Sequence, residues 1–155
     1  MSRVEGARFG HVNVTTHDWR RLADFYGEVF GLEPFGAERD IASPEFDRAV
    51  GLSGAHLRGI HLKLPGHEPG PTIEIYAYDE MAQEGPPAAV NRAGWGHIAF
   101  QVPDVVAAVA AVVAAGGSAF GDIVTTSTKD GRRVMWCYTQ DPDGNLLELQ
   151  AWLDA

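Results

Sequence analysis

The feature that most constrains the fold is a motif that occurs twice. A Gly-His pair opens each copy, a short alternating apolar run follows, and an Asp closes it: His11 to Asp18 in the first copy and His97 to Asp104 in the second. An offset of 86 residues separates both the two histidines and the two aspartates, so the copies align without a gap. Self-similarity at a fixed offset is typical of a duplicated structural unit. We therefore predict two related units, each with a histidine on its first strand.

The first copy has the periodicity of a strand, a helix and a hairpin. Residues 9–15 alternate apolar and polar, which predicts a strand. After Asp18, apolar side chains recur every three or four residues until Gly31, which predicts an amphipathic helix with a polar cap and a glycine stop. Residues 59–64 and 72–76 alternate again around a Pro/Gly-rich turn and predict a hairpin.

The second copy repeats that order. It predicts a strand over 97–102, a helix from Asp104 to the glycines at 116–117, and then strands. Residues 134–138 and 146–150 flank an Asp-Pro-Asp-Gly-Asn turn and match the first hairpin. The hairpins lie only 74 residues apart, so the first copy holds about twelve extra residues between its helix and its hairpin.

These repeats define the predicted domain organisation. Residues 1–80 form the first module, residues 81–95 a linker and residues 96–155 the second module. The extra residues of the first module belong to a long polar loop at 33–57, with one helical turn near 45–50. Loops longer than connection requires commonly carry function, which makes this loop a candidate for substrate selection.

Charge and composition exclude several classes of partner. A formal net charge of −9 repels phosphate backbones and anionic lipid heads, so we expect neither nucleic-acid nor membrane partners. The sequence shows no secretory signal, and its single cysteine, Cys137, cannot form an intrachain disulfide, which fits a cytoplasmic protein. Cys137 lies in an apolar strand, so we expect a packed side chain and no nucleophile.

Each copy supplies one His on its first strand and one Glu on its last strand. These four residues are predicted to share the same type of sheet face, because their strand neighbours are apolar and point the other way. Two imidazoles and two carboxylates suit one divalent ion, Zn, Ni, Co, Mn or Fe, with positions left open for water or substrate oxygens. The predicted metal ligands are His11, Glu74, His97 and Glu148.

The same motifs resemble those of the vicinal oxygen chelate superfamily. The resemblance rests on the two Gly-His pairs, the Thr-Ile-Glu at 72–74 and the Asp-Pro-Asp-Gly-Asn-Leu-Leu-Glu at 141–148, and it extends over the whole chain. It implies an α+β fold in which two tandem βαβββ modules form a curved, partly closed mixed sheet around a metal site. It also implies a homodimer that acts on a small molecule.

Among members of that superfamily, the chain is similar to glyoxalase I and methylmalonyl-CoA epimerase. The resemblance implies an isomerase or epimerase that transfers a proton at carbon α to a carbonyl through a metal-chelated enediolate. Glu148 is the first candidate for the base and Glu74 the second. We expect a small polar, carbohydrate- or cyclitol-like substrate, because no basic cluster marks a site for the phosphates of CoA.

Three alternatives remain open. A glyoxalase I-type lyase, similar to lactoylglutathione lyase, is supported by Glu74, since the epimerase family usually has Gln there. A ligand-binding or antibiotic-resistance protein would keep the fold without turnover. An Fe(II) dioxygenase would leave Glu74 without a ligand role.

Further residues are predicted to surround the substrate. Some share the metal-facing side of their strands, and others lie in the polar loop or carry groups that can act as a second acid or base. These candidates are Asn13, His61, Lys63, Tyr76, Gln101, Glu38 and Glu45.

Overall fold

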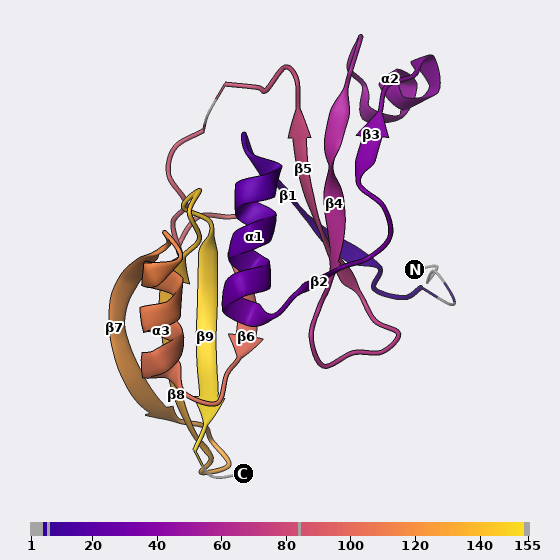
Figure 1. Cartoon of the computed structure of the whole chain (residues 1–155). Helices are drawn as coiled ribbons and strands as arrows, with labels where there is room; N and C mark the ends of the chain where they lie inside the picture. Colours follow the sequence, from indigo (N-terminus) through magenta and orange to yellow (C-terminus); the bar gives the residue numbers. More distant parts are fainter. Residues whose placement is uncertain (1–4, 6, 84, 154–155) are drawn as a thin grey trace. The chain divides into compact units, whose positions relative to one another are not determined.

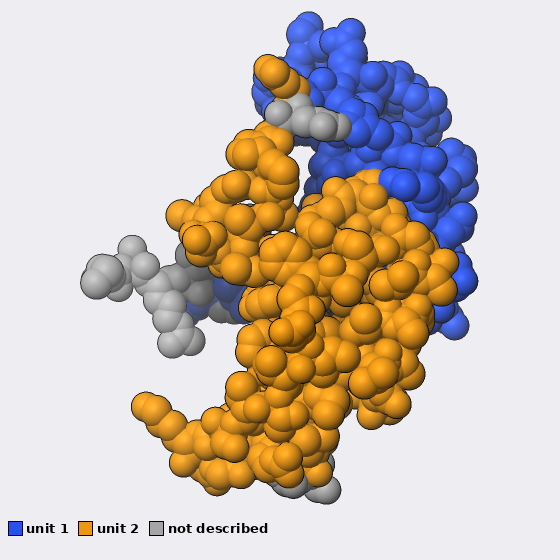
Figure 2. Space-filling model, turned by 90° about the vertical axis from the view of Figure 1, so that its left-hand side faces the viewer, with its two compact units in different colours: residues 1–82 blue, residues 83–155 orange. Residues whose placement is uncertain are grey.

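The computed structural model describes residue 5 and residues 7–83 and 85–153. The chain divides into two compact units, residues 1–82 and 83–155 (Figure 2). Each unit carries its own mixed sheet, and the described residues include three helices (Figure 1). The prediction of an α+β fold built from two tandem modules is confirmed, with the described strands arranged as two sheets, one in each unit.

The first unit brings the beginning and the end of its sequence together in one sheet. β1 (His11–Thr15) pairs in parallel with β5 (Thr72–Tyr78), and β5 pairs in antiparallel fashion with β4 (Leu57–Lys63). α1 (Trp19–Phe30) follows β1 and packs against β4 and β5. The predicted strand, helix and hairpin are therefore all present.

The ends of α1 show why this segment is helical. The Asp18 carboxylate accepts a hydrogen bond of 3.1 Å from the backbone N–H of Arg21, which satisfies one free donor of the first turn. Gly31 ends the helix at φ 70°, a left-handed conformation that glycine adopts without strain. The buried face consists of Trp19, Leu22, Phe25 and Tyr26.

Residues 33–57, predicted as a loop, contain three short elements. β2 (Glu33–Pro34) and β3 (Arg39–Ile41) both pair with β4, and α2 (Pro44–Val50) follows. Strands of two and three residues are too short to produce an alternating pattern. α2 has ordinary helix signals, with the Ser43 side chain as N-cap and proline at the first turn. The expected helical turn near 45–50 is therefore a complete short helix.

The second unit repeats the arrangement with fewer residues. Its elements are β6 (Ile98–Gln101), α3 (Val105–Ala114), β7 (Ser118–Ser127), β8 (Arg133–Gln140) and β9 (Leu146–Trp152). The strand order is β6-β9-β8-β7, with β6 parallel to β9 and the other pairs antiparallel. This is the predicted βαβββ module, and α3 covers one side of β7, β8 and β9 (Figure 1).

α3 consists entirely of valine and alanine and is 10 residues long. The Asp104 carboxylate caps it by accepting a 3.0 Å hydrogen bond from the backbone N–H of Ala107. Val105 and Val112 are its buried residues. Among the described residues, no helix is both long and apolar enough to cross a membrane.

The core of each unit lies between its helix and its last strand. Ile73 and Ile75 of β5 are 2% and 0% exposed, and Leu147 and Leu149 of β9 are both 0% exposed. Because side chains alternate along a strand, burying these residues sends the glutamate between each pair to the opposite face. Cys137 is also buried, and burial raises the pKa of its thiol.

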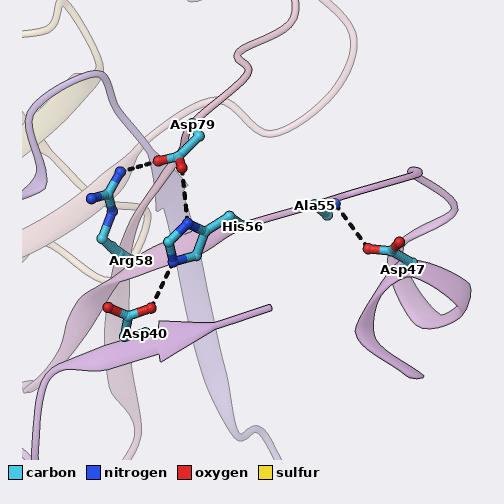
Figure 3. A network of polar contacts seen from close by, with 6 residues as sticks. All are labelled: Asp40, Asp47, Ala55, His56, Arg58 and Asp79. Atoms are coloured by element: carbon cyan, nitrogen blue, oxygen red, sulfur yellow. Dashed lines mark hydrogen bonds and ion pairs between the residues drawn. The ribbon is translucent and has the colours of Figure 1, made fainter. Parts of the chain in front are cut away.

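A polar network fastens the inserted strand β3 to the first sheet (Figure 3). His56 lies just before β4, and its Nδ1 is 2.8 Å from the Asp79 carboxylate at the end of β5. Its Nε2 is 2.6 Å from the Asp40 carboxylate of β3, and Arg58 also pairs with Asp79. Hydrogen bonds that His56 donates to Asp40 and Asp79 raise the pKa of His56, which favours the imidazolium that binds both carboxylates.

This network predicts a pH-dependent contribution to stability. A raised pKa in the folded state means that the contribution is complete below the unfolded-state pKa of about 6.5 and disappears as the pH rises through the folded-state pKa. Replacing His56 by Gln should therefore lower the thermal midpoint most near about pH 6 and progressively less toward about pH 8.5. Parallel thermal denaturation of the wild-type chain and His56→Gln across this range measures the difference.

The matched control for this experiment is His67→Gln. His67 is exposed and has no ion-pair partner within residues 7–83 and 85–153. Its replacement removes a histidine without removing an ion pair, so it should not reproduce the deficit of His56→Gln near about pH 6. A deficit of His56→Gln that grows as the pH rises would contradict the network.

Candidate metal centre

The parallel pairing of β1 with β5 brings the first predicted histidine to the first predicted glutamate. The register places Asn13 opposite Glu74 and His11 two pairs earlier, opposite Thr72 and on the same face. The Nε2 atom of His11 lies 3.4 Å from Oε2 of Glu74. The Glu74 side chain is only 12% exposed, whereas His11 is 53% exposed. The pair thus combines a sheltered carboxylate with an accessible imidazole.

A second imidazole reaches the same carboxylate from β4. His61 lies directly opposite Glu74 in the β4–β5 ladder, and its Nε2 is 3.2 Å from Oε1 of Glu74. The hydroxyl group of Tyr76 lies 2.5 Å from the same nitrogen. Four residues predicted for the site therefore form one cluster in the first unit: His11, His61, Glu74 and Tyr76.

Burial favours the uncharged forms of Tyr76 and His61. Burial, followed by the charge and hydrogen bonding of Glu74, raises the pKa of Tyr76 to about 12. Burial also lowers the pKa of His61, against the opposing effect of the Glu74 charge. An uncharged phenol and an imidazole with a depressed pKa therefore surround the carboxylate at neutral pH.

A glycine makes room for the tyrosine. Gly59 pairs with Tyr76 across the ladder. A Cβ atom added at Gly59 would lie 2.5 Å from Cδ1 of Tyr76 and still closer to the carbonyl oxygen of Ile75. The Tyr76 ring can occupy its position beside His61 only because position 59 has no side chain.

The second unit contains the equivalent His-Glu pair. β6 runs parallel to β9 with Ala99 opposite Glu148, and His97 directly precedes β6. The Nε2 atom of His97 lies 3.1 Å from Oε2 of Glu148, with side chains 34% and 20% exposed. Tyr138 lies opposite Glu148, and its ring meets the His97 ring edge-on at 5.1 Å.

The spacing within each pair fits two ligands of one divalent ion. Ligand atoms about 2.1 Å from a zinc-like ion, at tetrahedral or octahedral angles, lie roughly 3–3.4 Å apart. The pairs are 3.4 and 3.1 Å apart and consist of imidazole nitrogen and carboxylate oxygen, which such ions prefer. Within the described part of the chain, no group of three or more His, Cys, Asp and Glu residues forms a metal-binding cluster. Each unit thus offers two ligands, and the four-ligand centre stays a prediction.

The remaining predicted residues fall into two groups. Asn13 donates a 3.4 Å hydrogen bond to the backbone carbonyl of Glu74, and Gln101 lies opposite Gln150 at the end of β6. Lys63, at the end of β4, lies 3.7 Å from Glu68.

The two loop glutamates lie in exposed ion pairs. Glu38 binds Arg20 at 2.8 Å, and Glu45 binds Arg48 on α2 at 3.2 Å. Neither forms a hydrogen bond or an ion pair with the His11–Glu74 cluster in the described part of the first unit. The structure therefore brings together His61, Tyr76 and Glu74 but not the loop carboxylates.

Sequence reasoning missed Tyr138. It occupies the position equivalent to His61, since each lies opposite its unit's glutamate. The turn between β8 and β9 is three residues shorter than the one between β4 and β5, so a fixed offset of 74 residues pairs His61 with Met135 and hides the equivalence. Counting residues backward from the end of β4 and of β8 would have shown that His61 and Tyr138 occupy the same position before the turn.

Comparison with known proteins identifies the family. The profile of the glyoxalase/bleomycin resistance protein/dioxygenase superfamily matches residues 8–149. A search of curated protein sequences finds no significant match. Among solved structures, a glyoxalase family protein from Bacillus cereus superposes with a TM-score of 0.84 at 20% identity, covering 99% of both chains.

A second structure has the same fold at greater distance. A glyoxalase/bleomycin resistance protein/dioxygenase domain from Frankia sp. EAN1pec superposes with a TM-score of 0.57 at 19% identity and covers 100% of this chain and 95% of its own. At this level of identity the structures establish the fold, and the profile match over residues 8–149 establishes the family. The chain belongs to the glyoxalase/bleomycin resistance protein/dioxygenase superfamily, the vicinal oxygen chelate group that its repeated His and Glu motifs resemble.

Proposed function

We propose that this chain is a divalent-metal-dependent isomerase or epimerase that transfers a proton at carbon α to a carbonyl of a small polar metabolite. The observation that supports it most is the repeated imidazole–carboxylate pair, which occupies equivalent places in the two units at 3.4 and 3.1 Å. A protein that only sequesters a ligand has no need for two such pairs. We propose that His11, Glu74, His97 and Glu148 hold one ion together.

The residues have distinct roles in this proposal. A divalent ion bound there would supply Lewis-acid polarisation of the substrate's carbonyl oxygen. Glu148 removes the proton from the adjacent carbon, and its 20% exposed side chain has access to a substrate. Glu74 is more sheltered and accepts contacts from two imidazoles, which suits a ligand.

The polar surroundings favour a hydroxylated substrate. Asn13 and Tyr76 lie on the Glu74 face of the first sheet, and Gln101 and Gln150 lie on the Glu148 face of the second. The chain has a net charge of −9. Polar side chains on both faces suit a substrate with hydroxyl groups, and the negative charge disfavours one with several phosphates. We therefore propose a carbohydrate- or cyclitol-like ketone. A homodimer in the cytoplasm, as the sequence predicts, completes the proposal.

One observation favours a second function. Position 74 carries a carboxylate, where methylmalonyl-CoA epimerases usually have an amide and glyoxalase I has a carboxylate. A glyoxalase I-type lyase would use the same four ligands and the same proton transfer. It would differ in accepting a hemithioacetal and releasing a thioester.

Deuterium exchange tests the reaction class. The protein is loaded with Zn, Ni, Co or Mn and incubated in heavy water with a panel of small hydroxyketones and with methylglyoxal plus glutathione. The proposal expects deuterium to be incorporated at the α-carbon of a hydroxyketone. Incorporation should stop when a chelator removes the metal. Binding without exchange across the panel would contradict it, thioester release would favour the lyase, and oxygen consumption with Fe(II) would favour a dioxygenase.

Metal stoichiometry tests the shared centre. One ion per chain is expected, and His11→Ala and His97→Ala should each lower its affinity by at least about 100-fold, since even the residues that support ligands are worth about 10–100-fold. His67→Ala is the matched control and should bind as the wild type does. Two ions per chain, each lost with only one histidine, would contradict a shared centre.

A further inference from the structure

We propose that His61 is a positioning residue that holds the Glu74 carboxylate in its ligand orientation, so that the two glutamates of the site have different roles. The inference rests on the proposed metal centre. It assigns a role to a residue that has no equivalent histidine in the second unit. Its basis is the difference between the two units at structurally matching positions.

In the first unit, both oxygens of the carboxylate have imidazole partners. Oε2 of Glu74 faces Nε2 of His11 at 3.4 Å, and Oε1 faces Nε2 of His61 at 3.2 Å. The ladder register places His61 and Glu74 directly opposite each other, where cross-strand side chains are close neighbours. With an imidazole nitrogen close to each oxygen, the carboxylate has little room to rotate about its terminal torsion.

His61 is itself firmly held. Its neighbours Ile60 and Leu62 are buried, which fixes the strand and sends the imidazole to the Glu74 face. The Tyr76 hydroxyl lies 2.5 Å from Nε2 of His61, and the two ring centres are 5.7 Å apart. Only 16% of the His61 side chain is exposed. A side chain with so many constraints is suited to fix another group, as supporting residues do for metal ligands in general.

The second unit lacks this support. Tyr138 occupies the place of His61, and its ring contacts the His97 ring at 5.1 Å. Across residues 7–83 and 85–153, His97 is the one hydrogen-bond or ion-pair partner of Glu148, through Oε2 at 3.1 Å. Oε1 of Glu148 is therefore available to approach a substrate carbon, whereas Oε1 of Glu74 is engaged.

The asymmetry assigns the roles. Glu74 is held as a permanent ligand, and Glu148 retains the freedom that proton transfer requires. His61 acts through Glu74 and does not itself touch the reacting atoms. Its loss should consequently weaken the metal complex and spare the chemical step once metal is saturating.

A double-mutant cycle on metal affinity tests this. Zn²⁺ or Mn²⁺ binding to the full chain is measured by competition with a chromophoric chelator for the wild type, His61→Ala, Glu74→Ala and the double variant. His61→Ala should lower the affinity by about 10–100-fold. In the Glu74→Ala background the same change should have almost no further effect, because the group through which His61 acts is gone.

Conservative and matched variants separate positioning from general damage. His61→Gln keeps a side-chain N–H of similar reach and should recover most of the lost affinity. Tyr138→Phe, at the matching position of the second unit, should bind metal as the wild type does. Circular dichroism checks the fold of each variant. If His61→Ala does not fold, Tyr76→Phe, which removes the hydroxyl group beside both His61 and Glu74, should show a smaller loss of affinity.

The outcomes distinguish this inference from the proposed function. Wild-type affinity in His61→Ala, or an equal loss in both backgrounds, overturns the positioning role and leaves the metal centre intact. Normal exchange at saturating metal supports positioning, whereas abolished exchange with wild-type affinity would make His61 an acid or base. A wild-type chain that binds no divalent metal overturns both proposals.

Discussion

Replacing Glu148 by Gln is expected to slow metal-dependent deuterium exchange by about 10²–10⁴-fold, the usual contribution of a positioned general base. Gln keeps the size of the side chain and one oxygen, but it cannot accept a proton at neutral pH. The 3.1 Å contact with His97 is available to the amide oxygen, so the structure of the second unit should persist. Exchange is followed by NMR at saturating metal, which separates chemistry from metal affinity.

Glu74→Gln is the matched variant. The same change at the equivalent strand position should mainly weaken metal binding and leave most of the exchange rate at saturating metal, because Glu74 is engaged by two imidazoles. If Glu148→Gln retained full exchange while Glu74→Gln abolished it, the base would be Glu74 and the assigned roles would be reversed.

Replacing Gly59 by Ala is expected to destabilise the chain by about 1–3 kcal/mol or more, the range found for overpacked positions. A Cβ atom at this position meets both the Tyr76 ring and the Ile75 carbonyl oxygen. The ring is able to rotate away, but the carbonyl belongs to the β4–β5 ladder and moves only if that ladder distorts. Urea denaturation followed by circular dichroism measures the change in the free energy of unfolding.

Gly10→Ala provides the control for this change. Nothing lies within 4 Å of a Cβ atom placed at Gly10, and its φ is not positive. This variant should be as stable as the wild type or slightly more so, since alanine restricts the unfolded chain. Equal free energies of unfolding for Gly59→Ala and Gly10→Ala would contradict this prediction, because they would show that the β4–β5 ladder accommodates the added Cβ atom without loss of stability.

The repeat accounts for most of what the sequence reveals about the fold. Its copies are defined by local signals that act within a few residues: the Asp18 and Asp104 caps, the glycine stop at 31, and the alternation around Glu74 and Glu148. Each of these signals reflects a backbone or burial requirement that is met locally. The two modules, the amphipathic first helix and both hairpins were therefore predictable.

The remaining features depend on pairing between distant segments. β7 is largely exposed and its register shifts between Phe120 and Val124, so its sequence lacks a clean alternation. β2 and β3 are strands only because β4 offers them hydrogen-bonding partners.

The polar contacts of the site have the same long-range origin. Tyr138 lies beside His97 through the register of two ladders, and the His56 network joins groups from β3, β4 and the end of β5. Residue types and spacing along the chain do not directly specify such contacts between distant side chains. Hence the two His–Glu pairs were predictable from the repeat, and the places of His61 and Tyr76 beside Glu74 from strand alternation, whereas Tyr138 and the His56 network were not.

The parallel ladder in each unit also has a consequence for the order of folding. Each hairpin joins residues that are close in sequence, while β1–β5 and β6–β9 join the two ends of their unit. Contacts of long sequence separation carry the larger loop-closure cost and tend to form later. The imidazole and the carboxylate of each pair therefore meet only when the module closes. The proposed metal ion needs both groups of a pair, so it would bind only after the module has closed and would slow unfolding rather than speed folding.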